Sequence, residues 1–481
     1  FTFSRLPFFL DIVMSLYKVL AVIATIVAVG SALPVQSFTA SLESAQKGVK
    51  NGGSLWAVLV AGSSGYENYR HQADICHAYQ ILHSHGVPDS NIIVMMYDDI
   101  AKSSSNPDKG SIINEPNGPN VYPGVLKDYT KGDVKPKYLL DILSGNADGV
   151  KGVGSGRVVN STADDHIFLY FADHGAPGLI AFPNHYLIIP QSLSAKDLMN
   201  TLKGMHSANK YNKMTIYIEA CESGSMFAGI LPADMNIYAV TAANPHQSSY
   251  ACYHDNHLGT YLGDCFSNHW MEDTDNATAD GTFNTRTLQQ QYSNVAAVTT
   301  TSVVCQYGDT SLSSLPIQDF VGTGAVSASA KRSGGKKETN SVSSRDVELA
   351  ILHQAVQEPR DEEHLEWATS KLEKIAARRS HLSDLFKAII ENAGADVMSA
   401  YKVKDDASCD NDSTLSQLDC TNEAYHMFGN VCGGIDESFY THARALHHLC
   451  KVTSADRVMD AIKTECKNAD LVPPFVLYDR E

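Results

Sequence analysis

Two apolar runs of the same form, each ending beside a chemically reactive side chain, constrain how this chain can fold. Residues 214–219 run into Cys221, and the small and polar residues 222–225 follow at once. Residues 166–172 lead in the same way to His174. Continuous apolar runs bounded by turn residues are typical of strands buried on both faces of a parallel sheet. Because parallel strands deliver their carboxyl ends to one edge of the sheet, we expect Cys221 and His174 to meet there.

The first part of the chain predicts the same sheet. Residues 55–61 and 91–97 are expected strands, and a helix between them, reaching to about Gly86, has Ile75 and Leu82 on one face. A strand, a helix and a strand in that order form a βαβ unit with parallel strands, so we expect an α/β fold. Further along, the pattern predicts long loops at 99–137 and 144–163, a hairpin over 178–189, helices near 194–207, 260–272 and 285–297, and a strand over 235–243.

Composition sets the broad class. A chain of 481 residues with 43% hydrophobic content can bury a large core. Its formal net charge of −17 disfavours nucleic acid as a partner. Neither a C-x-x-C pair nor an H-E-x-x-H motif is present, so we expect no zinc or other metal, and the sequence implies no cofactor.

The N-terminal residues predict a secretory leader. We take Met14 as the start of translation, because Lys18, the apolar run 19–29 and the small residues 30–32 then form a cleavable signal peptide ending at residue 32. The alternative is a membrane anchor, but the run is short for a bilayer span. We expect a short propeptide over 33–53 and no membrane span once the leader is removed.

The character of the chain changes near residue 324. Residues 324–344 are basic and rich in Ser and Gly, which predicts a cleavable linker. Beyond it the apolar spacing is helical, as at Leu365, Ala368 and Leu372. Secretion permits disulfides, and five of the ten cysteines lie in this part, so we expect helices stapled by disulfides. Three glycosylation sequons are present, at Asn160, Asn276 and Asn411.

Cys221 is the candidate nucleophile. A buried structural cysteine is the usual alternative, but the turn residues after Cys221 argue for an accessible thiol. His174 would hold the proton while the thiolate attacks a carbonyl carbon. The backbone N–H groups of Gly175 and Cys221 would stabilise the developing oxyanion.

Six stretches of the sequence resemble the legumains, the asparaginyl endopeptidases of the caspase-like clan of cysteine proteases. The resemblance implies a caspase-like, mostly parallel sheet flanked by helices over 54–323, followed by an all-α C-terminal prodomain. It also implies a lysosomal, endosomal or vacuolar enzyme, or one secreted to an acidic lumen. The matching stretches are 65–74, 94–99, 171–175, 218–225, 242–245 and 261–264.

The resemblance assigns catalytic roles to three side chains. Cys221 matches the family's nucleophile and His174 its acid and base. Asn68 matches the residue that supports the histidine, because a side-chain amide can orient an imidazole without adding charge. A helix N-cap is the alternative role for Asn68.

The resemblance also places a pocket for the substrate side chain, formed by Arg70, His71, Glu219, Ser249 and Asp264. An asparagine side chain carries one acceptor oxygen and one NH2 donor. Arg70 would donate to the oxygen, while Glu219 and Asp264 would accept from the nitrogen. Aspartate would fit only when protonated, at lower pH. The alternative is a structural ion-pair cluster.

Further implications concern processing. Asp173 matches a residue that forms a succinimide linked to peptide ligation. A helical activation peptide over 345–395 would lie over the active site, and a stabilising domain would follow over 396–481. Family spacing pairs Cys420 with Cys450 and Cys432 with Cys466, which leaves Cys409 unpaired. Asn340 in the linker is the expected self-cleavage site in acid.

The expected partners are proteins and peptides with exposed asparagine, the chain's own prodomain as inhibitor, and cystatin-type inhibitors. Three other classes remain open on sequence alone. They are a caspase-like protease with Asp or basic specificity, a catalytically dead binding or adhesion protein, and a transpeptidase that mainly ligates.

Overall fold

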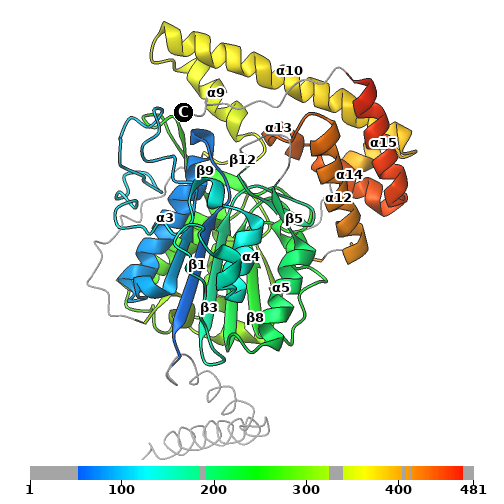
Figure 1. Cartoon of the computed structure of the whole chain (residues 1–481). Coiled ribbons are helices and arrows are strands. Elements are labelled where there is room, and N and C mark those ends of the chain that lie inside the picture. The colour runs from blue at the N-terminus through cyan, green and yellow to red at the C-terminus, as the bar shows by residue number, and fades with distance from the viewer. Residues whose placement is uncertain (1–52, 184–190, 324–339, 403–407, 411–412, 470–481) are drawn as a thin grey trace, which may run out of the picture. The chain divides into compact units, whose positions relative to one another are not determined.

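The computed structural model describes residues 53–183, 191–323, 340–402, 408–410 and 413–469 (Figure 1). The expected leader, nearly all of the propeptide, the second hairpin strand at 186–189, most of the linker and the Asn411 sequon lie outside these residues. Among the residues described, none of the helices is both long enough and apolar enough to cross a bilayer.

A six-stranded sheet forms the centre of the N-terminal part, in the order β11-β8-β7-β3-β1-β2 (Figure 1). Five neighbouring strands are parallel, as the sequence predicts, and only β11 is antiparallel to its neighbour. Their bounds are β1 Leu55–Ala61, β2 Ile92–Met95, β3 His166–Ala172, β7 Lys213–Glu219, β8 Ile237–Thr241 and β11 Cys305–Gly308.

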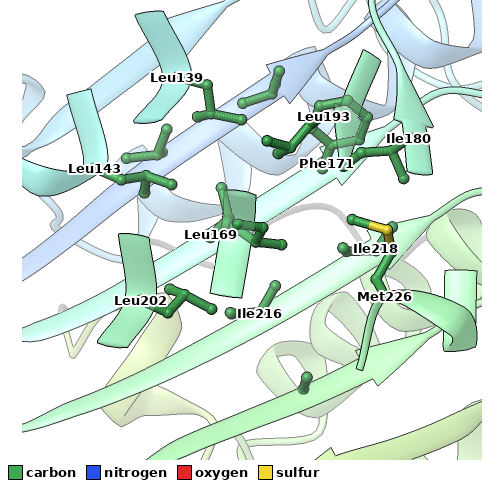
Figure 2. Close-up of a cluster of buried hydrophobic side chains, with 14 of the residues drawn as sticks. Leu139, Leu143, Leu169, Phe171, Ile180, Leu193, Leu202, Ile216, Ile218 and Met226 are labelled. Atoms are coloured by element: carbon green, nitrogen blue, oxygen red, sulfur yellow. The ribbon is translucent and has the colours of Figure 1, made fainter. Parts of the chain in front are cut away.

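Helices cover both faces of this sheet, since side chains alternate along each strand. Leu169 and Ile216 belong to a core shared with Leu202 (Figure 2). Tyr170 and Tyr217, one residue on from these, pack edge-on against Trp270 on the opposite face. The helices are α3 Tyr69–Ser84, α4 Pro136–Ser144, α5 Ala195–Ser207, α6 Cys265–Ala279, α7 Leu288–Val298 and α8 Gln318–Val321. Short 3-10 turns lie at Tyr66–Asn68, Asp89–Asn91, Lys131–Asp133, Ala147–Val150, Ser223–Met226 and Thr310–Ser314.

The helix expected near 260–272 begins later than the sequence pattern indicates. Thr260–Asp264 form strand β10, which pairs antiparallel with β9, Tyr250–Asp255. Gly259 supplies the left-handed turn between them with a φ of 66°. The local sequence suits either structure, and tertiary pairing with β9 selects the strand. A disulfide that the sequence did not predict, Cys252–Cys265, joins β9 to the first residue of α6.

The hairpin expected after His174 is a three-stranded sheet in the order β4-β5-β6, with both strand pairs antiparallel. Leu179 in β5 and Ala176 in β4 pack against the core of the C-terminal helices. The strands are β4 Gly175–Ala176, β5 Leu179–Ala181 and β6 Ser192–Ser194.

The C-terminal part is helical, as expected, and has a core of its own. The disulfides Cys420–Cys450 and Cys432–Cys466 lie within it. Cys409, expected to be unpaired, instead forms a disulfide with Cys305 of β11, a pairing between distant segments that spacing within the C-terminal part could not reveal. The helices are α9 Val347–Gln357, α10 Glu362–Asn392, α11 Val397–Tyr401, α12 Leu415–Val431, α13 Glu437–Tyr440, α14 Ala443–Val452 and α15 Ala455–Asn468.

The end of the expected linker is regular structure. Val342–Ser343 form strand β12, which pairs antiparallel with β9 at Ala251 and Tyr250. Composition favours a flexible chain here, but β9 offers an unpaired edge whose N–H and C=O groups the segment satisfies. Asn340, two residues before β12, is exposed and has a φ of 42°.

Candidate active site

Parallel pairing in register brings the two reactive residues to one edge of the sheet. Ala172 and Glu219, the last residues of β3 and β7, are direct partners. His174 and Cys221 each follow two residues later. The two chains touch beyond the strands, because a Cβ atom added to Gly175 would lie 2.4 Å from the Cys221 carbonyl oxygen. Glycine is therefore required at position 175 by the close approach of two backbones.

Asn68 orients the imidazole of His174. The Nε2 atom of His174 lies 2.8 Å from Oδ1 of Asn68, whose own NH2 group donates to the Ser64 carbonyl. Oδ1 only accepts, so Nε2 carries the proton and Nδ1 is left to exchange one. Asn68 is the N-cap residue of α3 but makes no capping hydrogen bond with its side chain, so the capping role considered from sequence is wrong.

The thiol of Cys221 is buried, contrary to the expectation that turn residues would expose it. Its sulfur accepts from the Ser249 N–H at 3.3 Å and lies 3.6 Å from the Ser249 hydroxyl. That hydroxyl is 3.2 Å from the hydroxyl of Ser344, next to β12. Within the described residues the hydrogen bonds of Cys221 lead to Ser249 and not to His174. Ser344, more than a hundred residues along the chain, is thus connected to the thiol through Ser249, which local sequence could not show.

Behind the thiol lies a cluster of buried charges. The Arg70 Nε atom donates to Oδ1 of Asp264 at 2.9 Å, and both side chains are at most 1% exposed. Glu219 accepts two hydrogen bonds of 2.9 Å at Oε2, from the N–H and the hydroxyl of Ser267. His71 lies between Asp264 and Asp173, at 3.5 and 3.4 Å. The structure thus brings the predicted pocket residues together, with Ser249 beside the thiol.

Arg70, Glu219 and Asp264 each have one buried atom that makes no hydrogen bond within the described residues. These atoms are Nη2 of Arg70, Oε1 of Glu219 and Oδ2 of Asp264. A purely structural ion-pair cluster would satisfy its own polar atoms, because an unsatisfied buried group costs roughly 1–3 kcal/mol. Here one donor and two acceptors of these three side chains are left without a hydrogen bond, although Oδ2 of Asp264 lies 3.5 Å from Nε2 of His71.

Burial dominates the protonation behaviour of these groups. It raises the pKa of Glu219, with the charge of Asp264 adding to the effect. It also raises the pKa of Asp264, against the influence of Arg70, and that of Asp173. The pKa of His71 is lowered well below its usual value by burial and by Arg70. The site therefore disfavours additional negative charge.

Three residues that the sequence analysis missed enter the site from the C-terminal part. Glu437 at the start of α13 places Oε2 at 2.9 Å from Nε2 of His174. Arg345 donates to Glu222 at 2.6 Å and to the Gly175 carbonyl at 2.7 Å. Arg444 donates to the other oxygen of Glu222. Glu222, the acidic residue after Cys221, could have drawn attention to the two arginines, because a buried carboxylate needs a partner.

Among the residues described, His71, Asp173 and His174 form the one group whose potential ligand atoms lie within 4.8 Å of one another. No metal is expected here from the sequence. One ring nitrogen of each histidine already has a hydrogen-bond partner, since Nδ1 of His71 lies 2.6 Å from the Ser63 hydroxyl and Nε2 of His174 faces Asn68. Asp173 is 2% exposed, and neither of its carboxylate oxygens makes a hydrogen bond to the described residues.

Of the residues expected to be processed or modified, Asp173 lies in this cluster, 3.4 Å from His71, and the described asparagines lie at the surface. Asn340, Asn160 and Asn276 are exposed.

Comparison with known proteins identifies relatives over most of the chain. A family model described as the peptidase C13 family matches residues 55–323. Legumain of Mus musculus is 42% identical over 415 residues, covering 86% of this chain and 92% of that protein. The vacuolar-processing enzyme delta-isozyme of Arabidopsis thaliana is 39% identical over 451 residues, covering 88% and 92%. A hemoglobinase of Schistosoma mansoni is 39% identical over 416 residues, covering 85% and 91%.

The Glu437 contact gives a pH-dependent prediction. Burial acts to raise the pKa of this carboxyl, but the charge of His174 and hydrogen bonds from His174 and Asn68 lower it to about 2. The pKa of Glu437 is lower in the folded protein than in the unfolded one, where it is near 4.5, so the charged carboxylate stabilises the fold above that pH. This stabilisation is lost as the pH falls toward 2. In a Cys221→Ala background, we expect Glu437→Gln to lower the thermal midpoint at pH 5.5 by on the order of 2–4 °C.

That difference should fall to less than half at pH 3, measured by scanning calorimetry or fluorescence. Glu366→Gln, at an exposed position of α10, is the matched control and should leave the midpoint unchanged at both pH values. A Glu437→Gln difference of the same size at pH 5.5 and pH 3 would contradict the assignment.

Proposed function

This chain belongs to the peptidase C13 family and is a cysteine endopeptidase, and we propose that it cleaves the peptide bond that follows an asparagine. The observation that carries the proposal is the set of three unsatisfied atoms behind Cys221. Nη2 of Arg70 can donate to a carboxamide oxygen, while Oε1 of Glu219 and Oδ2 of Asp264 can accept from its NH2 group.

This arrangement accounts for selectivity by the cost of leaving polar groups unpaired. A leucine or alanine side chain would bury the three atoms without bonding them, which supports discrimination of about 10⁴-fold or more. An aspartate carboxylate would face Glu219 and Asp264 in a site that already disfavours negative charge. Aspartate is therefore accepted at lower pH, where one of these carboxyls is protonated.

The chemistry follows from the orientation of His174. With Nε2 held by Asn68, Nδ1 of His174 takes the thiol proton, and the Cys221 sulfur attacks the carbonyl carbon of the asparagine itself. The N–H groups of Gly175 and Cys221 stabilise the oxyanion. His174 then protonates the leaving amine, and an acyl-enzyme remains. Water releases the acid, whereas a second peptide amine would give ligation, so both outcomes share one intermediate.

The C-terminal part acts as an intramolecular inhibitor. Residues 342–345 continue from β12 across the site, and Ser344 donates its N–H to the Ser249 carbonyl at 3.0 Å. Glu437 occupies Nε2 of His174, while Arg345 and Arg444 neutralise Glu222, whose side chain is fully buried. A substrate cannot reach Cys221 until these contacts are broken, so the chain as described is a zymogen.

The linker residue Asn340 is the proposed activation site. It is exposed and four residues before Ser344, the residue that contacts Ser249 beside the thiol. The active site of the same chain is covered by the segment that follows Asn340. This favours cleavage after Asn340 by another, activated copy of the protein. The name of the vacuolar-processing relative supports a vacuolar or lysosomal compartment as the place of activation. Cystatin-type proteins are proposed inhibitors of the mature enzyme.

The central test is turnover of a peptide with one internal asparagine after acid incubation. We expect Cys221→Ser to lower kcat/KM by at least about 10³-fold, because the serine hydroxyl is not ionised in this site. Cys76→Ala is the matched control, since Cys76 is the other buried free cysteine, and it should retain turnover. Replacing asparagine by leucine in the peptide should abolish cleavage. Equal turnover by wild type and Cys221→Ser would refute the proposal.

Activation is tested separately by mass spectrometry of the acid-treated chain. We expect a new C-terminus at Asn340, and slower activation of Asn340→Gln, because glutamine extends the amide by one methylene beyond the pocket atoms. Asn209→Gln, at another exposed asparagine with positive φ, should activate normally. Activation of Asn340→Gln at the wild-type rate, with the new terminus elsewhere, would exclude Asn340 as the site.

A further inference from the structure

The carboxylate of Glu219 accepts the last hydrogen bond of a short chain of hydroxyl groups. The Tyr170 hydroxyl donates to the Ser267 hydroxyl oxygen at 2.6 Å, and Ser267 donates to Oε2 of Glu219 at 2.9 Å. The Ser267 backbone N–H reaches the same oxygen at 2.9 Å. All three side chains are at most 1% exposed. Neither Ser267 nor Tyr170 belongs to the residues that face the proposed substrate.

This chain of hydrogen bonds determines which oxygen of Glu219 remains available to a ligand. Both donors of Ser267 are used on Oε2, so Oε1 is the oxygen left without a partner. Ser267 is the third residue of α6, and its N–H is one of the donors at the start of a helix that favour a negative charge. A rotation of the carboxylate would break two hydrogen bonds, so its orientation is fixed before any ligand arrives.

We propose that Ser267, supported by Tyr170, is a positioning residue for Glu219 that favours the charged form of its carboxylate and aims it at the substrate, and thereby sets the preference for asparagine over aspartate. This inference rests on the proposed function. A charged Glu219 accepts from an amide and repels a carboxylate. A neutral Glu219 carries its own proton, which it can donate to an aspartate side chain, so the distinction is lost.

The charges around Glu219 act in both directions. Asp264 at the end of β10 and Asp74 of α3 oppose ionisation, whereas Arg70 of α3 favours it. The Tyr170 hydroxyl faces the same group of carboxylates from β3. Burial raises the pKa of Glu219, and the two Ser267 hydrogen bonds lower it. Removing the hydroxyl leaves only the N–H, so the carboxyl would take up a proton at a higher pH.

The test compares kcat/KM for two peptides that differ only in asparagine or aspartate at the cleaved position, across pH 4 to 7. For activated Ser267→Ala, we expect the aspartate-to-asparagine ratio to rise about tenfold at a given pH, and its pH profile to move upward by about one unit. The loss for asparagine should lie mainly in KM. Tyr170→Phe should shift the profile in the same direction by less, and Ser267→Thr should restore it.

Two controls separate positioning from general destabilisation. Thr274→Ala removes another fully buried hydroxyl from α6, and Tyr217→Phe removes the hydroxyl of the tyrosine paired with Tyr170 in the sheet. Both should keep the wild-type profile. A wild-type profile for folded Ser267→Ala and Tyr170→Phe would overturn this inference alone. A wild-type enzyme with no asparagine preference would instead overturn the proposed function.

An independent observation concerns the Cys305–Cys409 disulfide. Cys305 lies in β11 at the edge of the central sheet, and Cys409 precedes α12 and packs against the core of the N-terminal part. The two cysteines are 104 residues apart, and Asn340 lies between them. A cut after Asn340 therefore leaves the chain carrying Glu437 and Arg444 covalently bound to the catalytic part.

We infer that this disulfide retains the inhibitory part after the linker is cut, so that one cleavage is not sufficient for release. A tethered inhibitor rebinds at an effective concentration set by the tether, in the millimolar range for a short connection, whatever the enzyme concentration. Inhibition should therefore survive dilution. Release would require a further cut beyond Cys409, or exchange with a thiol reductant that leaves both cysteines as thiols and is itself oxidised to a disulfide.

The test follows acid-cut enzyme on a non-reducing gel and by intact mass. For wild type we expect one covalent species that separates on reduction, and residual inhibition that does not change on hundredfold dilution. Cys409→Ser should separate without reductant and lose its inhibition on dilution. The double variant Cys420→Ser/Cys450→Ser, which lacks a disulfide inside the C-terminal part, should remain tethered. A wild-type fragment that starts at residue 341, contains Cys409 and is released without reductant would overturn the inference.

Discussion

The in-register parallel pairing of β3 with β7 is the constraint on which the rest of the structure depends. Pairing of Ala172 with Glu219 fixes where both strands end, and the reactive residues follow each end by the same number of residues. A slip of one residue would turn the side chains of one strand to the opposite face of the sheet. The apolar cores on both faces prevent such a slip, so packing far from the thiol determines the geometry at the thiol.

A group of buried charges, which a folded protein would ordinarily avoid, lies beside the ends of these strands. Arg70, Glu219 and Asp264 are buried, and only some of their hydrogen-bonding capacity is used. Burying charges without complete pairing opposes folding. The cluster is tolerated because Ser267 and the start of α6 hold Glu219, and because Arg70 pairs with Asp264. In the function that we propose, the remaining atoms select the substrate side chain, so the incomplete pairing is the functional property.

The C-terminal part covers the site in a different way. Its charged side chains pair with opposite charges of the site and do not fill the pocket. Glu437 faces His174, and two arginines face Glu222. Strand β12 adds main-chain pairing beside the thiol, as an extended peptide would. The cover is therefore selective for this surface, and its contact between Glu437 and His174 responds to pH, whereas the disulfide at Cys305 does not.

The sequence by itself determined the parallel α/β sheet, the placement of Cys221 and His174 at its edge, and the helical, disulfide-bonded tail, because buried strands and amphipathic helices leave local apolar patterns. Motif resemblance added Asn68 and the pocket residues. The burial of Cys221, strand β12, the Glu437 and Arg345 contacts, and the Cys305–Cys409 bond were decided only by tertiary structure. Each joins segments that are far apart in the chain, and a pairing between distant segments leaves no periodic trace in either of them.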